Sequence, residues 1–284
     1  MRAILIRFPV PTSRIEKVIY GMNMVLIRIA LSFVIAGAWI ASVTYFGERL
    51  GSRKAGLLGN MPSNILISLL FMGITKGPEY AAASTAGVPV GMMIDTIFLA
   101  VFIFTIPRGL RIALPASFAA WALAAVLALA VLPPLSFLAS IAAYAIVTAA
   151  LFFLVSAKLG AKRVEKKPVK FSWKVSLIRA FFAGGVVAGA VAIAQVAPPY
   201  MTGVLATFPA VMTSTMVILS MSQGFDFAQA TGKILILSSC NIIVFSTCAG
   251  LFFVALGPWL STLLAYAASV CSILIIDRLT AKVR

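Results

Sequence analysis

One acidic residue stands alone in the middle of a long apolar stretch. Asp95 lies in GVPVGMMIDTIFLAV, with no other charged residue within ten positions on either side. An acid at the centre of a transmembrane helix costs about 2.5–3.5 kcal/mol on insertion scales, so it normally faces a cavity or a partner. Asp95 is therefore either a proton carrier or cation ligand, or a structural carboxyl that bonds to a neighbouring hydroxyl or amide and fixes helix packing. Because the charge is costly and solitary, we favour the functional interpretation.

Two prolines, Pro62 and Pro209, each interrupt an apolar stretch about one turn from its start. Proline lacks a backbone donor and blocks the carbonyl one turn earlier, so the freed backbone groups need other partners. Interrupted spans at matching places in two halves of a chain are the best sequence indication of a transport site. The alternative is that a helix simply starts at each proline.

Asn241, in SSCNIIVF, is the most prominent amide in the second half of the chain. It could complete a coordination shell with the neighbouring serines, or it could hold helices together by an amide hydrogen bond worth about 1 kcal/mol. Both interpretations stay open. The predicted ion- or substrate-binding residues are Asp95, Asn241, Asn64, Ser63, Thr213 and Ser238, with Pro62 and Pro209 as helix breaks.

The composition argues against other kinds of chemistry. Hydrophobic residues make up 62% of the 284 residues and charged residues only 11%, whereas soluble domains carry about 25% charged residues. The chain has no histidine, and its three cysteines lie in apolar stretches. We find no nucleophile–base pair, metal-ligand cluster or phosphate loop, so we expect no enzyme activity, no metal and no cofactor. The net charge of +16 falls in short segments between apolar runs, which indicates membrane topology signals rather than nucleic-acid binding.

The apolar runs predict an all-α integral membrane protein with about nine transmembrane helices. A span needs about 20 apolar residues to cross the hydrocarbon core. The predicted spans are 24–46, 56–75, 80–106, 110–132, 135–157, 174–196, 202–222, 227–254 and 257–277.

The chain also contains an internal duplication. GLLGNMP, which ends at Pro62, matches GVLATFP, which ends at Pro209, and a glycine–acid turn at Gly77 recurs at Gly224 with the same offset of 147 residues. These matches divide the chain into two four-helix repeats. The predicted segments are an N-terminal interfacial segment (1–23), the first repeat (24–132), a linking transmembrane helix (133–157), a basic cytoplasmic linker (158–173), the second repeat (174–278) and a cytoplasmic tail (279–284).

The loop charges indicate that the two repeats are inverted. An odd number of spans separates the start of one copy from the start of the next, so the second copy enters the membrane from the opposite side. Loops of the first copy contain the basic residues Arg49, Arg53, Lys54, Arg108 and Arg111, whereas the matching loops 197–201 and 256–258 contain no charge. Positive loops face the cytoplasm, so we expect a cell-membrane protein with its N-terminus outside and its C-terminus inside. The basic residues near the N-terminus oppose this orientation.

The second copy, especially GVLATFPAVMTSTMVILSMSQGFDFAQATGK, resembles the GlpM-like family of small four-span bacterial membrane proteins. The matching parts are the glycine-to-proline stretch and the glycine–acid turn. The resemblance covers about 100 residues in each copy and implies the four-helix unit, not a reaction. The chain departs from that family by fusing two units through an extra helix. By arrangement alone, it also resembles fused forms of dual-topology fluoride channels, although none of their filter motifs is recognisable.

These features together predict a transporter or permease with a midplane site between inverted repeats. It would move a small ion or small solute, with proton coupling through Asp95 as one form of the mechanism. The alternatives are an ion channel of the fused dual-topology type and a non-transporting membrane assembly or lipid-handling protein. The expected partners are the lipid bilayer and a small ion or small-molecule substrate, with no nucleic acid. A homo-oligomer stays open.

Overall fold

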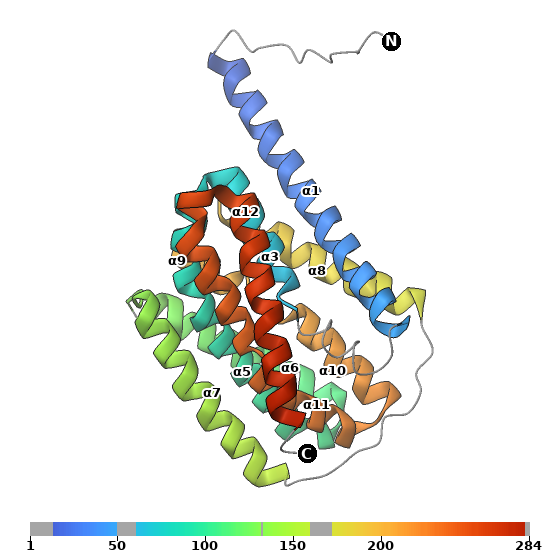
Figure 1. The fold of residues 1–284 in the computed structure, drawn as a ribbon. Helices are drawn as coiled ribbons and strands as arrows, with labels where there is room; N and C mark the ends of the chain where they lie inside the picture. The colour runs from blue at the N-terminus through green and yellow to red at the C-terminus, as the bar shows by residue number, and fades with distance from the viewer. Residues whose placement is uncertain (1–13, 50–60, 132, 160–171, 282–284) are drawn as a thin grey trace.

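The computed structural model describes residues 14–49, 61–131, 133–159 and 172–281, and these residues form a helical bundle without strands (Figure 1). The predicted interfacial segment, basic linker and C-terminal tail lie partly outside the described residues. The helices are α1 (Arg14–Arg49), α3 (Ser63–Lys76), α4 (Pro78–Ser84), α5 (Val88–Thr105), α6 (Leu110–Val126), α7 (Phe137–Leu159), α8 (Trp173–Ile193), α9 (Pro199–Leu205), α10 (Ala210–Ser222), α11 (Phe225–Ser238) and α12 (Cys240–Ala281). Short 3-10 turns follow α4 and α5, and a π-helical turn follows α6.

Among the described residues, seven helical stretches are long and apolar enough to cross a membrane, so the fold is that of a membrane protein. The helix Ser63–Lys76 is apolar but has only 14 residues. The last two predicted spans fall within one stretch, Phe225–Ile275. α1 already begins at Arg14, so the helix of the first predicted span extends into the segment expected to lie at the interface.

Four glycines join helices at turns that other residues rarely adopt. Gly77, Gly109, Gly224 and Gly257 have φ angles of 100°, 99°, 97° and 73°, in the left-handed half of backbone space that glycine enters without steric cost. They form two pairs along the chain. Gly224 follows Gly77 by 147 residues, and Gly257 follows Gly109 by 148 residues. The two halves therefore place the same turn chemistry at matching positions.

α1 and α8, the first helices of the two halves, pack against each other and run in opposite directions. Tyr45 near the end of α1 stacks on Trp173 at the start of α8, with ring centroids 5.9 Å apart. Further along α8, a Cβ on Gly184 would lie 2.7 Å from the carbonyl oxygen of Phe33. Small residues such as Gly184 let the two helix backbones approach closely.

The central helices of the two halves are also antiparallel. Gly250 in α12 lies against Thr85 just after α4, while Gly232 in α11 lies against Ile103 near the end of α5. The side chain of Gln229 in α11 donates a hydrogen bond of 2.7 Å to the carbonyl oxygen of Ile103. Residue numbers thus rise along one partner as they fall along the other.

The long helix α12 consists of two segments that meet at Gly257, where the backbone leaves helical geometry. Pro258, at the start of the second segment, lies against Gly73 in α3. Two turns later, the hydroxyl of Tyr266 donates to the sulfur of Met61, at a distance of 2.6 Å, just before α3. The second segment therefore runs antiparallel to α3, and Figure 1 shows the chain reversing direction within α12.

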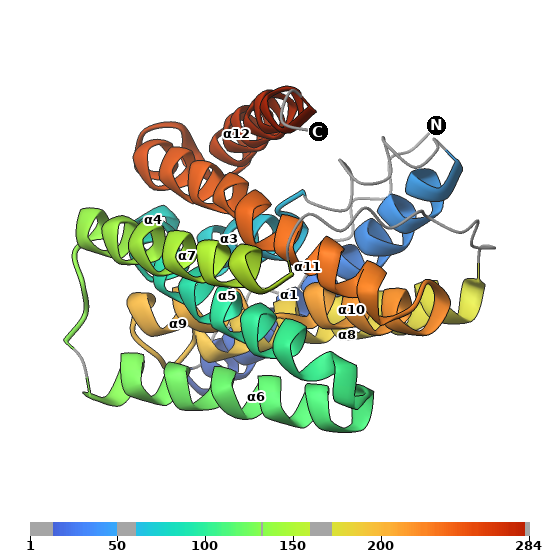
Figure 2. The same cartoon turned by 90° about the horizontal axis from the view of Figure 1, so that it is seen from below.

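The stretch from α4 to α5 is the most buried of the spans. Figure 2 shows α5 between α6, α7 and α9, and α11 also packs on it. Phe98, Phe102 and Ile103 on α5 are fully buried and form a core cluster with residues of α6, α7 and α11. The candidate acid Asp95 therefore lies on the helix that the rest of the bundle encloses.

The contact between α9 and α4 gives a test of this packing. A Cβ on Gly203 would overlap the backbone oxygen of Ser84, whereas one on Gly189 in α8 would meet no atom within 4 Å. We expect Gly203→Ala to lower the free energy of unfolding by about 1–3 kcal/mol or more. The control Gly189→Ala should leave stability unchanged or raise it by up to about 1 kcal/mol. Thermal unfolding of both variants in detergent measures the difference, and equal stability would contradict the packing of α9 on α4.

Candidate functional site

Asp95 lies in the middle of α5 and is only 1% exposed. The indole Nε1 of Trp121, on α6, donates a hydrogen bond of 2.9 Å to its Oδ1. From the described residues, the second carboxylate oxygen accepts no hydrogen bond. Asp95 is thus a buried carboxyl with a single hydrogen-bond donor, and polar groups of this kind inside a membrane are candidates for functional sites.

Aromatic rings surround the hydrogen bond between Trp121 and Asp95. Phe208, between α9 and α10, meets the Trp121 ring edge-on with centroids 4.9 Å apart. Phe208 also stacks on Phe118, at 5.9 Å, and Phe118 in turn contacts Phe98 at 5.1 Å. Such an apolar, aromatic environment strengthens any electrostatic interaction that the carboxyl makes.

The helix break at Pro209 lies beside this aromatic group. α9 ends at Leu205 and α10 begins at Ala210, with Pro209 at its N-cap position. A Cβ on Gly91, one turn before Asp95, would overlap the hydroxyl of Thr207 in the break. The absence of a side chain at Gly91 therefore lets the break approach α5 closely. The structure brings together two predicted features, the buried acid of one half and the proline break of the other.

Asn241 and Asp95 hold comparable places along the two central helical stretches, judged by their positions between two shared contacts. Thr85 contacts Gly250 at one end of the two central helical stretches, and Ile103 contacts Gly232 at the other end. By residue number, Asp95 and Asn241 each lie about midway between these two contacts. Asn241 is 1% exposed near the start of α12. The side chain of Asp95 turns toward α6, however, because its hydrogen bond goes to Trp121.

The remaining predicted residues lie in other places. Ser63 accepts a hydrogen bond of 3.1 Å from Nε1 of Trp39 at the start of α3, directly after Pro62. Oδ1 of Asn64 is buried and has no hydrogen-bond partner among the described residues. Thr213 bonds back to the carbonyl oxygen of Pro209 at 2.7 Å, and Ser238 to that of Leu235 at 3.4 Å. Pro62, Ser63 and Asn64 thus form a second polar region, near α1 and the second segment of α12.

The sequence did not single out Trp121, Phe208 or Tyr144 as site residues. The hydroxyl of Tyr144 on α7 shares a 2.6 Å hydrogen bond with Ser239, directly before α12. A signal was available for two of them, because a tryptophan or tyrosine far inside a span needs a partner for its polar tip. Nothing comparable marks Phe208, which differs from other apolar residues only through its place in the helix break.

Searches against family models, curated proteins and solved structures find no match. The GlpM-like resemblance stays a prediction.

The hydrogen bond between Trp121 and Asp95 can be tested through stability. Trp121→Phe keeps an aromatic ring but removes the donor from a buried carboxyl, so we expect the free energy of unfolding to fall by about 1–3 kcal/mol. Asp95→Asn keeps an acceptor oxygen in the same place and should cost less. Trp173→Phe, at a position that is 61% exposed, serves as control. If Trp121→Phe lowers the free energy of unfolding in detergent no more than the control does, the hydrogen bond does not stabilise the fold.

Proposed function

We propose that the chain is a membrane transporter that moves a small ion or small solute, with its site at Asp95 between two inverted four-helix units. One observation carries this proposal: the break between α9 and α10, in the second half of the chain, packs on α5 of the first half beside the buried Asp95. Transporters built from inverted repeats place their sites near the bilayer midplane, at the repeat interface, and form them from discontinuous helices.

Pairs of contacts related by the repeat support the inverted arrangement. Adding 147 to Thr85 gives Gly232, and adding 147 to Ile103 gives Gly250. The contact of Thr85 with Gly250 and that of Ile103 with Gly232 are therefore the same contact with the two halves exchanged. A twofold axis that passes through the crossing near Asp95 and Asn241 produces such a pair.

A second pair of contacts, between other helices, obeys the same relation. Met61 corresponds to Phe208 with an offset of 147, and Phe118 corresponds to Tyr266 with the offset of 148 that relates Gly109 to Gly257. Phe208 packs on Phe118, and Met61 accepts the hydrogen bond of Tyr266. The antiparallel packing of α1 on α8 fits the same axis, because inverted units present equivalent helices in opposite directions.

In the proposed arrangement, the units span 24–132 and 174–278 and α7 links them, which gives nine crossings in the cell membrane. The positive-inside rule favours an external N-terminus and a cytoplasmic C-terminus. Asp95 binds the proton or cation, and the α9–α10 break places Thr207 against Gly91, one turn before the acid. The partner of Asp95 on α6, Trp121, holds one carboxylate oxygen and leaves the other for the cargo.

The transport role of Asp95 predicts a loss of flux in Asp95→Asn. A thermal-shift screen of the purified chain against alkali cations, ammonium, small organic cations and neutral metabolites first finds a ligand, because a ligand of the folded form alone raises its stability. Uptake of that ligand into proteoliposomes should then fall at least about tenfold in Asp95→Asn, with loss of its pH dependence, since a neutral amide does not exchange protons. Ser42→Ala, at an exposed site on α1, is the control.

The same assay separates the alternative functions. Flux that does not saturate and needs no coupling ion would indicate a channel. No flux for any ligand, together with lipids or proteins that co-purify in fixed amounts, would indicate an assembly or lipid-handling protein. Unchanged uptake and pH dependence in Asp95→Asn would refute the role of the acid.

The inverted topology predicts that the turns at Gly109 and Gly257 lie on opposite sides of the membrane. Single cysteines replace Arg108 and Trp259 in a background in which Cys240, Cys248 and Cys271 are changed to alanine. An impermeant maleimide applied to intact cells should label Trp259→Cys, and Arg108→Cys should react only after the membrane is opened. Labelling of both from the same side would exclude inverted units.

A further inference from the structure

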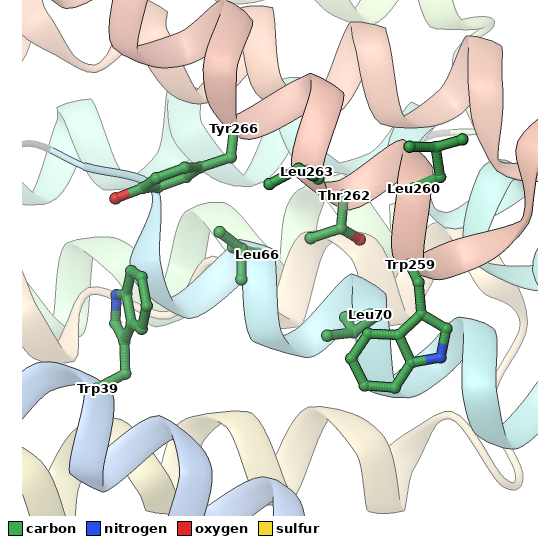
Figure 3. A pocket seen from close by; sticks show the side chains of 8 residues that line it. All are labelled: Trp39, Leu66, Leu70, Trp259, Leu260, Thr262, Leu263 and Tyr266. Atoms are coloured by element: carbon green, nitrogen blue, oxygen red, sulfur yellow. The ribbon is translucent and has the colours of Figure 1, made fainter.

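An apolar groove runs along the surface between α1, α3 and the second segment of α12 (Figure 3). Leu66 and Leu70 of α3 form its floor, and Trp39 of α1 and Tyr266 of α12 lie at one end. Trp259 lies at the other end. The volume of the groove is about 540 Å³, within the range of roughly 300–1,000 Å³ that is usual for small-molecule sites.

The groove offers water almost nothing to bind. The polar atoms of its inner lining already have partners within the protein. Nε1 of Trp39 donates to Ser63, the hydroxyl of Tyr266 donates to Met61, and the hydroxyl of Thr262 donates to the carbonyl of Pro258. A buried water needs two to four polar partners. An apolar occupant therefore suits this groove better than water does.

The open side of the groove faces outward, toward lipid in a membrane-embedded chain. Trp259 is 70% exposed and Leu263 is 65% exposed on the wall formed by α12. Acyl chains are the apolar groups that surround a membrane protein at the highest concentration. They reach the groove from the side, without crossing any other part of the bundle.

A basic residue, Arg28, lies at one end of the groove. Nη1 of Arg28 on α1 donates a 2.9 Å hydrogen bond to the carbonyl oxygen of Ile74, near the end of α3. Pro258, next to Trp259, lies against Gly73 at the same end. Lys76, half a turn further along α3, directs its ammonium to the ring of Tyr80 and the carbonyl oxygen of Gln195, so Arg28 is the cation at this end of the groove. Arg28 uses one of its five N–H donors on Ile74 and has others for an anion, while Trp39 lies about 16 Å deeper along α1.

We propose that this groove binds an anionic phospholipid, with one acyl chain between α1 and α12 and the phosphate at Arg28. The positive charge of Arg28 complements a lipid that carries a net negative charge. The apolar floor accepts the chain as far as Trp39 and Tyr266. This lipid site is separate from the site at Asp95 and does not depend on the proposed transport function.

Trp39 is the natural reporter of an acyl chain in the groove, because it is partly buried at the deep end. A variant that carries Trp173→Phe and Trp259→Phe keeps Trp39 and Trp121. The full-length variant is reconstituted in phosphatidylcholine vesicles with rising fractions of phosphatidylglycerol brominated on its acyl chains, which quench tryptophan on contact. A further change of Trp39→Phe gives the background from Trp121. We expect brominated phosphatidylglycerol to quench Trp39 at a mole fraction roughly fivefold lower than brominated phosphatidylcholine.

Two variants separate the phosphate contact from the groove. Arg28→Gln should make the two lipids quench equally, and Thr262→Phe, which fills the groove, should remove quenching of Trp39 by both. Leu264→Phe, on the same helix but outside the groove lining, should change neither result. Arg28→Gln changes a partly exposed side chain, so it tests the proposal even if Thr262→Phe does not fold.

Several results would overturn the proposal. These are no quenching of Trp39 by either lipid, equal quenching by both lipids in the parent protein, or quenching unaffected by Arg28→Gln and Thr262→Phe. A dimer that protects Trp39 from both lipids would also overturn it, because a second copy of the chain would then occupy the groove.

Discussion

A carboxyl group within a membrane must find its partners inside the protein, because hydrocarbon supplies none. Asp95 meets this constraint on the most enclosed stretch of the bundle, through the indole of Trp121. The neighbouring helices complete its surroundings. α6 supplies the donor, and the break between α9 and α10 closes the space beside it with Phe208. One carboxylate oxygen accepts the indole hydrogen bond, and the other is the oxygen to which the proposed ligand would bind.

Glycines make this close packing feasible at the two places that matter most. Gly91 lets the helix break lie directly on α5, and Gly203 lets α9 lie on the backbone of the turn after α4. Because lipid tails are as apolar as the helices, no hydrophobic force drives the helices together, and close van der Waals contact is a main source of stability. The same small residues that stabilise the bundle therefore also bring the second half of the chain to the acid of the first half.

The two halves of the chain contribute unequally to the candidate site. The acid lies in the first half, and the residue with an offset of 147 from Asp95 is the apolar Ile242. Met61 is the residue equivalent to Phe208. It accepts a hydrogen bond from Tyr266, which lines the apolar groove. The proposed twofold axis would thus relate backbones whose side chains differ in chemistry. In our proposals, one side binds an ion or small solute and the other binds an acyl chain.

The sequence by itself determined the membrane class, most helix boundaries and the turns at Gly77 and Gly224, because apolar length and turn residues are local properties. The match of Gly77 with Gly224 is likewise visible in the amino-acid sequence alone. Only the tertiary structure decided that Asp95 turns to Trp121 rather than toward Asn241, and that Pro209 lies beside the acid while Pro62 does not. Helix rotation and neighbour choice depend on packing between segments far apart in the chain, and no local pattern encodes them.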